Sequence, residues 1–140
     1  MSAGEAFIAS IAREPRLRFR GLWQTLGWGF VALVVHLSLT SDPPDLGVPK
    51  AFDAGHVLAY FWLMFWFAQI HHAGRARLVI AAGCLGLGVA LEFVQGMTGY
   101  RMFEYSDMAL DALGVGIGLA LARTRLRYIL GAVEGLIAKP

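Results

Sequence analysis

The stretch LVIAAGCLGLGVALEFVQGM, residues 78–97, is twenty residues long and contains one charged residue, Glu92. A helix of about 20 mainly apolar residues spans the roughly 30 Å hydrocarbon core of a bilayer. Lipid offers no hydrogen-bond partner to an unpaired backbone group, so a single segment crosses it most economically as a helix. The stretch therefore predicts a transmembrane helix.

Three further apolar stretches approach the same length, at about 21–40, 54–70 and 107–122. The last is short and starts with acids, so we expect it to begin in the headgroup layer. The whole chain is 57% hydrophobic with a mean hydropathy of +0.58, above the roughly half-apolar composition of soluble domains. Its 140 residues suffice for one domain. The sequence predicts an all-α fold: a polytopic membrane protein with a four-helix transmembrane bundle at 21–125.

Basic residues predict the orientation of this bundle. Ten of the twelve lysines and arginines would lie on one side: Arg13, Arg16, Arg18, Arg20, Arg75, Arg77, Arg123, Arg125, Arg127 and Lys139. Lys50 and Arg101 would lie on the other. The positive-inside rule makes the ten-residue side cytoplasmic, so both termini are predicted to be cytoplasmic. The flanking segments 1–20 and 126–140 fit two interpretations, an amphipathic helix on the inner leaflet or a disordered basic tail.

Ionisable residues within a span are costly, which makes them candidates for function. By the predicted topology, seven of the ten acids lie on the outer side: Asp42, Asp45, Asp53, Glu92, Glu104, Asp107 and Asp111. Helical spacing places His56 and Tyr60 on one face of the second span. It likewise places Glu92 and Gln95 on one face of the third span, one turn above Gly88.

The fourth span carries a single stripe of acids and glycines. Its members are Asp107, Asp111, Gly114 and Gly118, at i, i+4, i+7 and i+11. The two glycines form a GxxxG step, which lets a neighbouring helix approach closely. Since they share the stripe with the acids, we expect the acids to face the bundle.

The outer polar residues allow two interpretations. They can be structural pairs that clamp helix ends, or they can form a functional site. Three carboxylates, those of Glu92, Asp107 and Asp111, have one strong base close in sequence, Arg101. Such a cluster is expected to bind a cation, recruit a cationic ligand, or hold a proton on at least one acid. We expect Glu92, Arg101 and Asp107 to form one site with His56 at its edge.

Two blocks of the chain resemble the VanZ-like family of small bacterial membrane proteins, which includes a teicoplanin-resistance protein. The first block is Phe52-Asp53-Ala54-Gly55-His56-Val57-Leu58-Ala59-Tyr60. The second is Glu92-x-x-Gln95, then Arg101, then Ser106-Asp107-x-x-x-Asp111-x-x-Gly114-x-x-x-Gly118. The first block departs from the family pattern in having Phe52-Asp53 where Asp-Lys is usual, and Asp111 replaces a frequent asparagine. The resemblance implies a multi-pass protein of the bacterial inner membrane, linked in some members to glycopeptide or lipopeptide resistance.

Three functions fit these observations. The first is an envelope protein whose outer polar cluster binds a lipid headgroup, a lipid-linked cell-wall precursor or an amphiphilic antibiotic. The second is a membrane-embedded phospho-lipid hydrolase or transferase with a divalent cation on Glu92, Asp107 and Asp111, since hard cations prefer oxygen ligands. The third is a structural or accessory membrane subunit. Membrane lipid is the expected partner, and nothing in the sequence favours nucleic acid.

Overall fold

The computed structural model describes residues 16–42 and 51–137. For residues 51–53 it describes the backbone only, and side chains are described from Ala54 onward. These residues are all-helical. The elements are α2 (Arg20–Leu39), α3 (Ala51–Ile70), α4 (Gly74–Met97), α5 (Tyr105–Leu121), the short 3-10 helix η1 (Arg125–Tyr128) and α6 (Ile129–Ile137). The N-terminal segment 1–20, for which the sequence left two interpretations, lies outside the described part of the chain up to residue 15.

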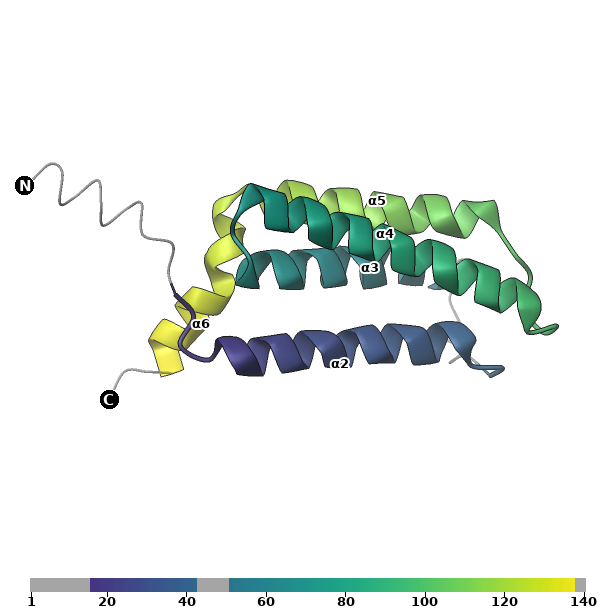
Figure 1. The fold of residues 1–140 in the computed structure, drawn as a ribbon, viewed down its shortest axis with the longest axis horizontal. Coiled ribbons are helices and arrows are strands. Elements are labelled where there is room, and N and C mark those ends of the chain that lie inside the picture. The colour runs from purple at the N-terminus through teal and green to yellow at the C-terminus, as the bar shows by residue number, and fades with distance from the viewer. Residues whose placement is uncertain (1–15, 43–50, 138–140) are drawn as a thin grey trace, which may run out of the picture.

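Helices α2 to α5 run alongside one another, and α6 crosses one end of the bundle (Figure 1). The start of α2, the end of α3, the start of α4 and the end of α5 lie at that same end. The opposite end carries the α4–α5 connection, where Gly99 adopts a φ of 78°, a conformation that favours glycine. Chain direction thus alternates from helix to helix, so α3 and α5 run parallel to each other.

The α3–α5 pair is the closest in the bundle, because two glycines of α5 leave room for the α3 backbone. A Cβ at Gly114 would lie 2.3 Å from the Val57 carbonyl oxygen, and one at Gly118 would lie 2.8 Å from the Phe61 carbonyl oxygen. Gly116, between them on the chain, has nothing within 4 Å of such a Cβ. The GxxxG step therefore faces α3, as the stripe predicted.

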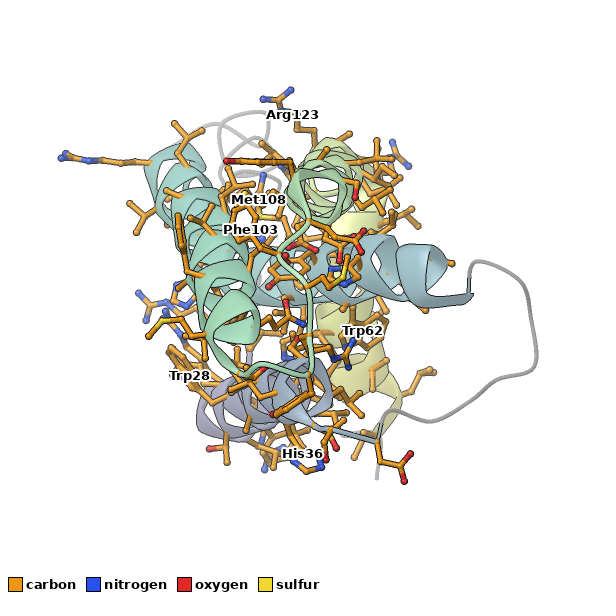
Figure 2. All side chains as sticks on the ribbon, turned by 90° about the vertical axis from the view of Figure 1, so that its right-hand side faces the viewer. Trp28, His36, Trp62, Phe103, Met108 and Arg123 are labelled. Carbon is orange, nitrogen blue, oxygen red and sulfur yellow. The ribbon has the colours of Figure 1, made fainter. Side chains whose placement is uncertain are left out.

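Helix α3 forms the centre of the molecule and packs against each of the other long helices. Its side chains Leu63, Met64 and Ala68 are fully buried and form a core cluster with Val115 of α5. Figure 2, which looks along the bundle from the α4–α5 connection, shows side chains filling the space between the helices. From Leu63 to Ile70 the side chains of α3 are buried or half-buried, whereas Leu58 and Trp62, nearer its start, are 63% and 40% exposed.

A second cluster of apolar side chains joins α6 to the end of the bundle that it crosses. We call this the basic end, because Arg16, Arg18, Arg20, Arg75, Arg123 and Arg125 lie there. Leu130 of α6 packs with Trp66 and Ile70 of α3, and Trp23 of α2 packs against them. The Leu130 N–H also donates to the Gln69 side-chain oxygen at 3.1 Å. The segment 126–140, for which the sequence left two interpretations, thus contains an ordered helix docked on the bundle as far as Ile137.

Two described helices, α2 and α4, are long and apolar enough to cross a membrane by length and composition. A third span results if α5 is counted together with Arg125–Ile137, to which it is bent by 79°. The described part of α3, Ala54–Ile70, is apolar but shorter. The chain is therefore a helical protein with two or three helices able to span a membrane, and four spans remain a prediction.

Candidate functional site

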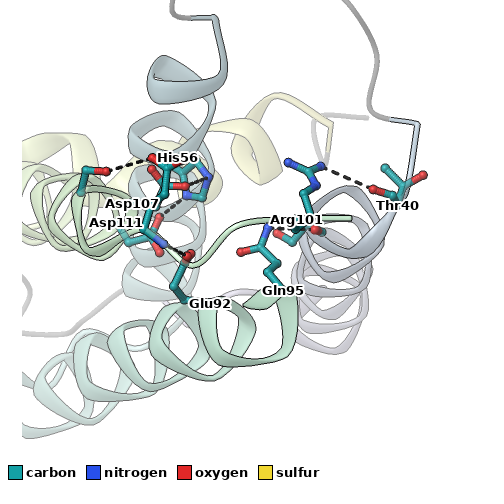
Figure 3. A network of polar contacts seen from close by, with 10 residues as sticks. Thr40, His56, Glu92, Gln95, Arg101, Asp107 and Asp111 are labelled. Carbon is teal, nitrogen blue, oxygen red and sulfur yellow. Dashed lines mark hydrogen bonds and ion pairs between the residues drawn. The ribbon is translucent and has the colours of Figure 1, made fainter. Parts of the chain in front are cut away.

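His56 of α3 lies between two aspartates of α5, close to the start of both helices (Figure 3). Its Nδ1 is 2.8 Å from Asp111 Oδ1, and its Nε2 is 3.4 Å from Asp107 Oδ2. All three side chains are nearly or fully buried. An imidazole can donate from both ring nitrogens only when it is protonated, so two facing carboxylates suit the imidazolium form. The parallel pairing of α3 and α5 produces this arrangement.

Glu92 of α4 joins the same end of the bundle from the other side (Figure 3). It is one of the most deeply buried residues of the described chain, at 2% exposure, and its Oε1 accepts a hydrogen bond from the Glu104 backbone N–H. Glu104 immediately precedes α5, so the Glu92 carboxylate lies near the positive end of that helix dipole. Ser106 Oγ in turn donates to the exposed Glu104 carboxylate at 3.3 Å. We call His56, Glu92, Asp107 and Asp111 the outer cluster.

Two predicted neighbours of the outer cluster have packing roles. Gly88 leaves space for Asp111, since a Cβ there would lie 2.6 Å from Asp111 Oδ2. Tyr60, one turn below His56, is buried in the apolar core cluster of α3 and α5. On the side toward the middle of the bundle, the outer cluster therefore adjoins the apolar core cluster.

Gln95 and Arg101 point to the end of α2, and Figure 3 shows Arg101 set apart from His56. Gln95 Nε2 donates to the Ser38 carbonyl at 2.9 Å, and an Arg101 terminal nitrogen donates to the Thr40 carbonyl at 3.5 Å. Tyr100, which the sequence did not single out, donates its hydroxyl to the Leu39 carbonyl at 2.7 Å. The last carbonyls of a helix have no partner within it, so these three side chains cap α2.

The metal interpretation has no support from this geometry. Among the described residues, no group of three or more His, Cys, Asp or Glu side chains is arranged to hold a metal ion. The proposed ligands Glu92, Asp107 and Asp111 therefore do not form such a group. The chemistry that the cluster does offer is charge: three carboxylates around one imidazole.

Glu134, a buried acid at the basic end of the bundle, was not predicted from the sequence as a functional residue. Glu134 of α6 accepts hydrogen bonds from the Arg18 N–H at 2.6 Å, the Phe19 N–H at 2.8 Å and the Trp23 indole at 2.7 Å. Burial alone would raise the pKa of Glu134, but these three donors hold it below the usual value. The carboxylate caps the start of α2 from a distant part of the chain. Its only sequence signal is an acid four residues after Leu130 in an otherwise apolar helix.

Near it, His71 follows the end of α3 and faces α2. Its Nδ1 lies 3.2 Å from an Arg20 terminal nitrogen, and its Nε2 lies 3.4 Å from Gln24 Nε2. Burial and the Arg20 charge lower the pKa of His71, which favours the neutral ring. Both ends of α2 are therefore held by polar contacts from other parts of the chain.

Comparison with known proteins gives one distant relative to report. No protein-family profile matches the chain, and no solved structure matches it. An uncharacterized protein of the fission yeast Schizosaccharomyces pombe is 28% identical over 96 residues, covering 66% of this chain and 59% of the yeast protein. The chain thus spans less than two thirds of that relative's length. Since the relative is itself uncharacterized, it contributes no activity.

Proposed function

We propose that this chain is a VanZ-like membrane protein of the bacterial cell envelope, whose outer cluster binds the polar head of an amphiphile. The amphiphile would be a lipid headgroup, a lipid-linked cell-wall precursor or an amphiphilic antibiotic. The proposal includes four spans, cytoplasmic termini and an inner-membrane location. It is carried by one observation: His56, from the first block that resembles the family, contacts Asp107 and Asp111 of the second block.

The charge of the outer cluster favours a ligand with a cationic group. The outer cluster places three carboxyl groups around a single imidazole, so acidic groups outnumber basic ones there. A positively charged head placed nearby would interact favourably with these acids. Glu104 and Asp42 are exposed at the same end of the bundle and extend the acidic character to the surface.

A second candidate, a purely structural clamp, has its own supporting observation. Gln95, Tyr100 and Arg101 bind the last carbonyls of α2, and Glu92 binds the backbone just before α5. In that case the polar residues join helix ends and the protein acts as an accessory subunit. The two candidate functions differ in how removal of a single charge should affect stability and phenotype.

The test uses Glu92→Gln and Asp107→Asn, with Asp42→Asn as the control at an exposed acid of the same end. Thermal unfolding of each purified variant is measured beside the teicoplanin susceptibility of cells that express it. The binding function predicts variants that fold with near-parental stability yet lose the resistance phenotype, while Asp42→Asn retains it. Variants that keep the phenotype while folding normally would contradict the site. A parallel loss of stability and phenotype would favour the clamp.

A further inference from the structure

The surface of α6 that faces away from the bundle is apolar, and nothing in the described chain covers it. Leu130 and Glu134 occupy the buried face of this helix. Ile129, Ala132 and Leu136, at i, i+3 and i+7, share another face and are exposed. Leu136 is 74% exposed and Ile129 41% exposed. The helix therefore presents an apolar stripe while its opposite side is fixed to α2 and α3.

The direction of α6 suits a position along a membrane surface. The segment Arg125–Ile137 is bent by 79° from α5, so it runs across the end of the bundle (Figure 1). If α5 is close to the membrane normal, α6 lies close to the membrane plane. An apolar stripe on a helix in that plane is the arrangement by which amphipathic helices insert into the boundary between headgroups and acyl chains.

Charge at the same end identifies the kind of lipid. Arg123 lies between α5 and η1, and Arg125 is the first residue of η1, which leads directly into α6; both arginines are exposed. Other exposed arginines of this end are Arg16, Arg18, Arg20 and Arg75. The one acid among the described residues of this end, Glu134, is buried and holds backbone donors of α2. The surface is therefore strongly positive beside the apolar stripe.

We propose that α6 is an interfacial helix whose apolar stripe lies among the acyl chains, and that Arg123 and Arg125 bind the headgroups of anionic phospholipids there. This surface is at the opposite end from the outer cluster; the inference rests on the membrane topology in the proposed function but not on a ligand at the outer cluster. Lys and Arg residues near an anionic leaflet each favour it by roughly a fivefold factor. Glu134 and Gln69 would then fix the depth and angle at which α6 meets the lipid.

The test places a fluorescent bimane probe on a single cysteine at position 136. Leu136→Cys is made in a Cys84→Ala background, because Cys84 is the one native cysteine and is buried. The protein is reconstituted in vesicles that contain either brominated phosphatidylcholine or brominated phosphatidylglycerol at equal mole fractions. The control probe is Ile117→Cys, at a 40% exposed position on α5 that is six residues before Arg123, or about 9 Å along the helix.

We expect both brominated lipids to quench the probe at 136, and phosphatidylglycerol to do so several-fold more effectively. The double substitution Arg123→Gln and Arg125→Gln should bring the two lipids to equal quenching at 136, while the probe at 117 shows no preference in either background. Equal quenching by both lipids in the parent would overturn the anionic preference. Quenching at 136 by aqueous iodide, but by neither lipid, would overturn the interfacial position of α6.

Discussion

At the scale of single residues, His56 holds the outer cluster together because each of its ring nitrogens faces a different aspartate. Removing it takes away the imidazole that contacts both Asp107 and Asp111. Breaking a buried charge pair in this way costs about 3–5 kcal/mol. We therefore expect His56→Ala to lower the free energy of unfolding by about 3 kcal/mol, a figure from the same range.

A double-mutant cycle distinguishes the loss of the charge contact between His56 and Asp111 from a simple loss of packing. Asp111→Asn in the His56→Ala background removes one of the two repelling carboxylates, so it should restore part of the lost stability. His36→Ala, at an exposed position on α2, is the control and should change little. Additive effects of His56→Ala and Asp111→Asn in chemical unfolding would show that the two side chains are not coupled.

Glu134 gives a second prediction at this scale. Hydrogen bonds to a charged group are worth about 1.5–3 kcal/mol, and Glu134→Gln weakens three of them, so we expect it to destabilise the fold by about 2 kcal/mol at neutral pH. Glu104→Gln, which changes an exposed acid, is the matched control. Unfolding of the two variants in detergent measures the difference, and equal stabilities would contradict a capping role for Glu134.

The pH dependence of the stability that Glu134 contributes follows from the direction in which its pKa is shifted. Because the pKa of Glu134 is lowered on folding, its contribution is complete above the unfolded pKa of about 4.5 and is lost as the pH falls through the folded pKa. The stability difference between the parent and Glu134→Gln should therefore be constant near neutrality and shrink below about pH 4.5. A difference that grows on acidification would contradict the assignment.

At the scale of elements, the α3–α5 pair depends on glycine. Gly114→Leu or Gly118→Leu would drive side-chain atoms into the α3 backbone, and overpacking of this kind costs about 1–3 kcal/mol or more. Gly116→Leu adds the same side chain on a face with nothing within 4 Å, so it should be tolerated. Thermal unfolding of the three variants is the measurement, and equal tolerance would contradict the close pairing.

Leu119 and Leu121, on the same helix, would be poor controls for this experiment. Leu119 is partly buried and packs against the core cluster, and Leu121 is also half-buried. Leu113, which is 53% exposed, is a better control position on this helix. The glycines themselves indicated the buried stripe correctly, because GxxxG spacing selects one face of a helix.

The helices were predictable to different degrees for a physical reason. Long apolar runs identify α2 and α4 because the membrane requirement acts on length and composition alone. Helix α6 has nine residues, too few to be stable alone, and its order comes from Leu130, Glu134 and their distant partners. Local sequence could not distinguish it from a disordered tail.

At the scale of the whole molecule, the parts of the site that depend on local helical spacing could be predicted, and the parts that depend on distant segments could not. Helical spacing placed Asp107 and Asp111 on one stripe, and the expected parallel course of the second and fourth spans brings His56 to their level. The partner of Arg101 was not predictable, because it depends on the path of the α4–α5 connection and on where α2 ends. Arg101 binds the Thr40 carbonyl, a contact across 61 positions of the chain.

Both proposals depend on the outer cluster and the basic end lying on opposite sides of a membrane. Single cysteines at Met102, which is 79% exposed beside the outer cluster, and at Ala73, exposed at the basic end, test this in the Cys84→Ala background. We predict that a membrane-impermeant maleimide labels Met102→Cys in intact spheroplasts and labels Ala73→Cys only after permeabilisation. Labelling of both from the same side, or the reverse pattern, would contradict the account.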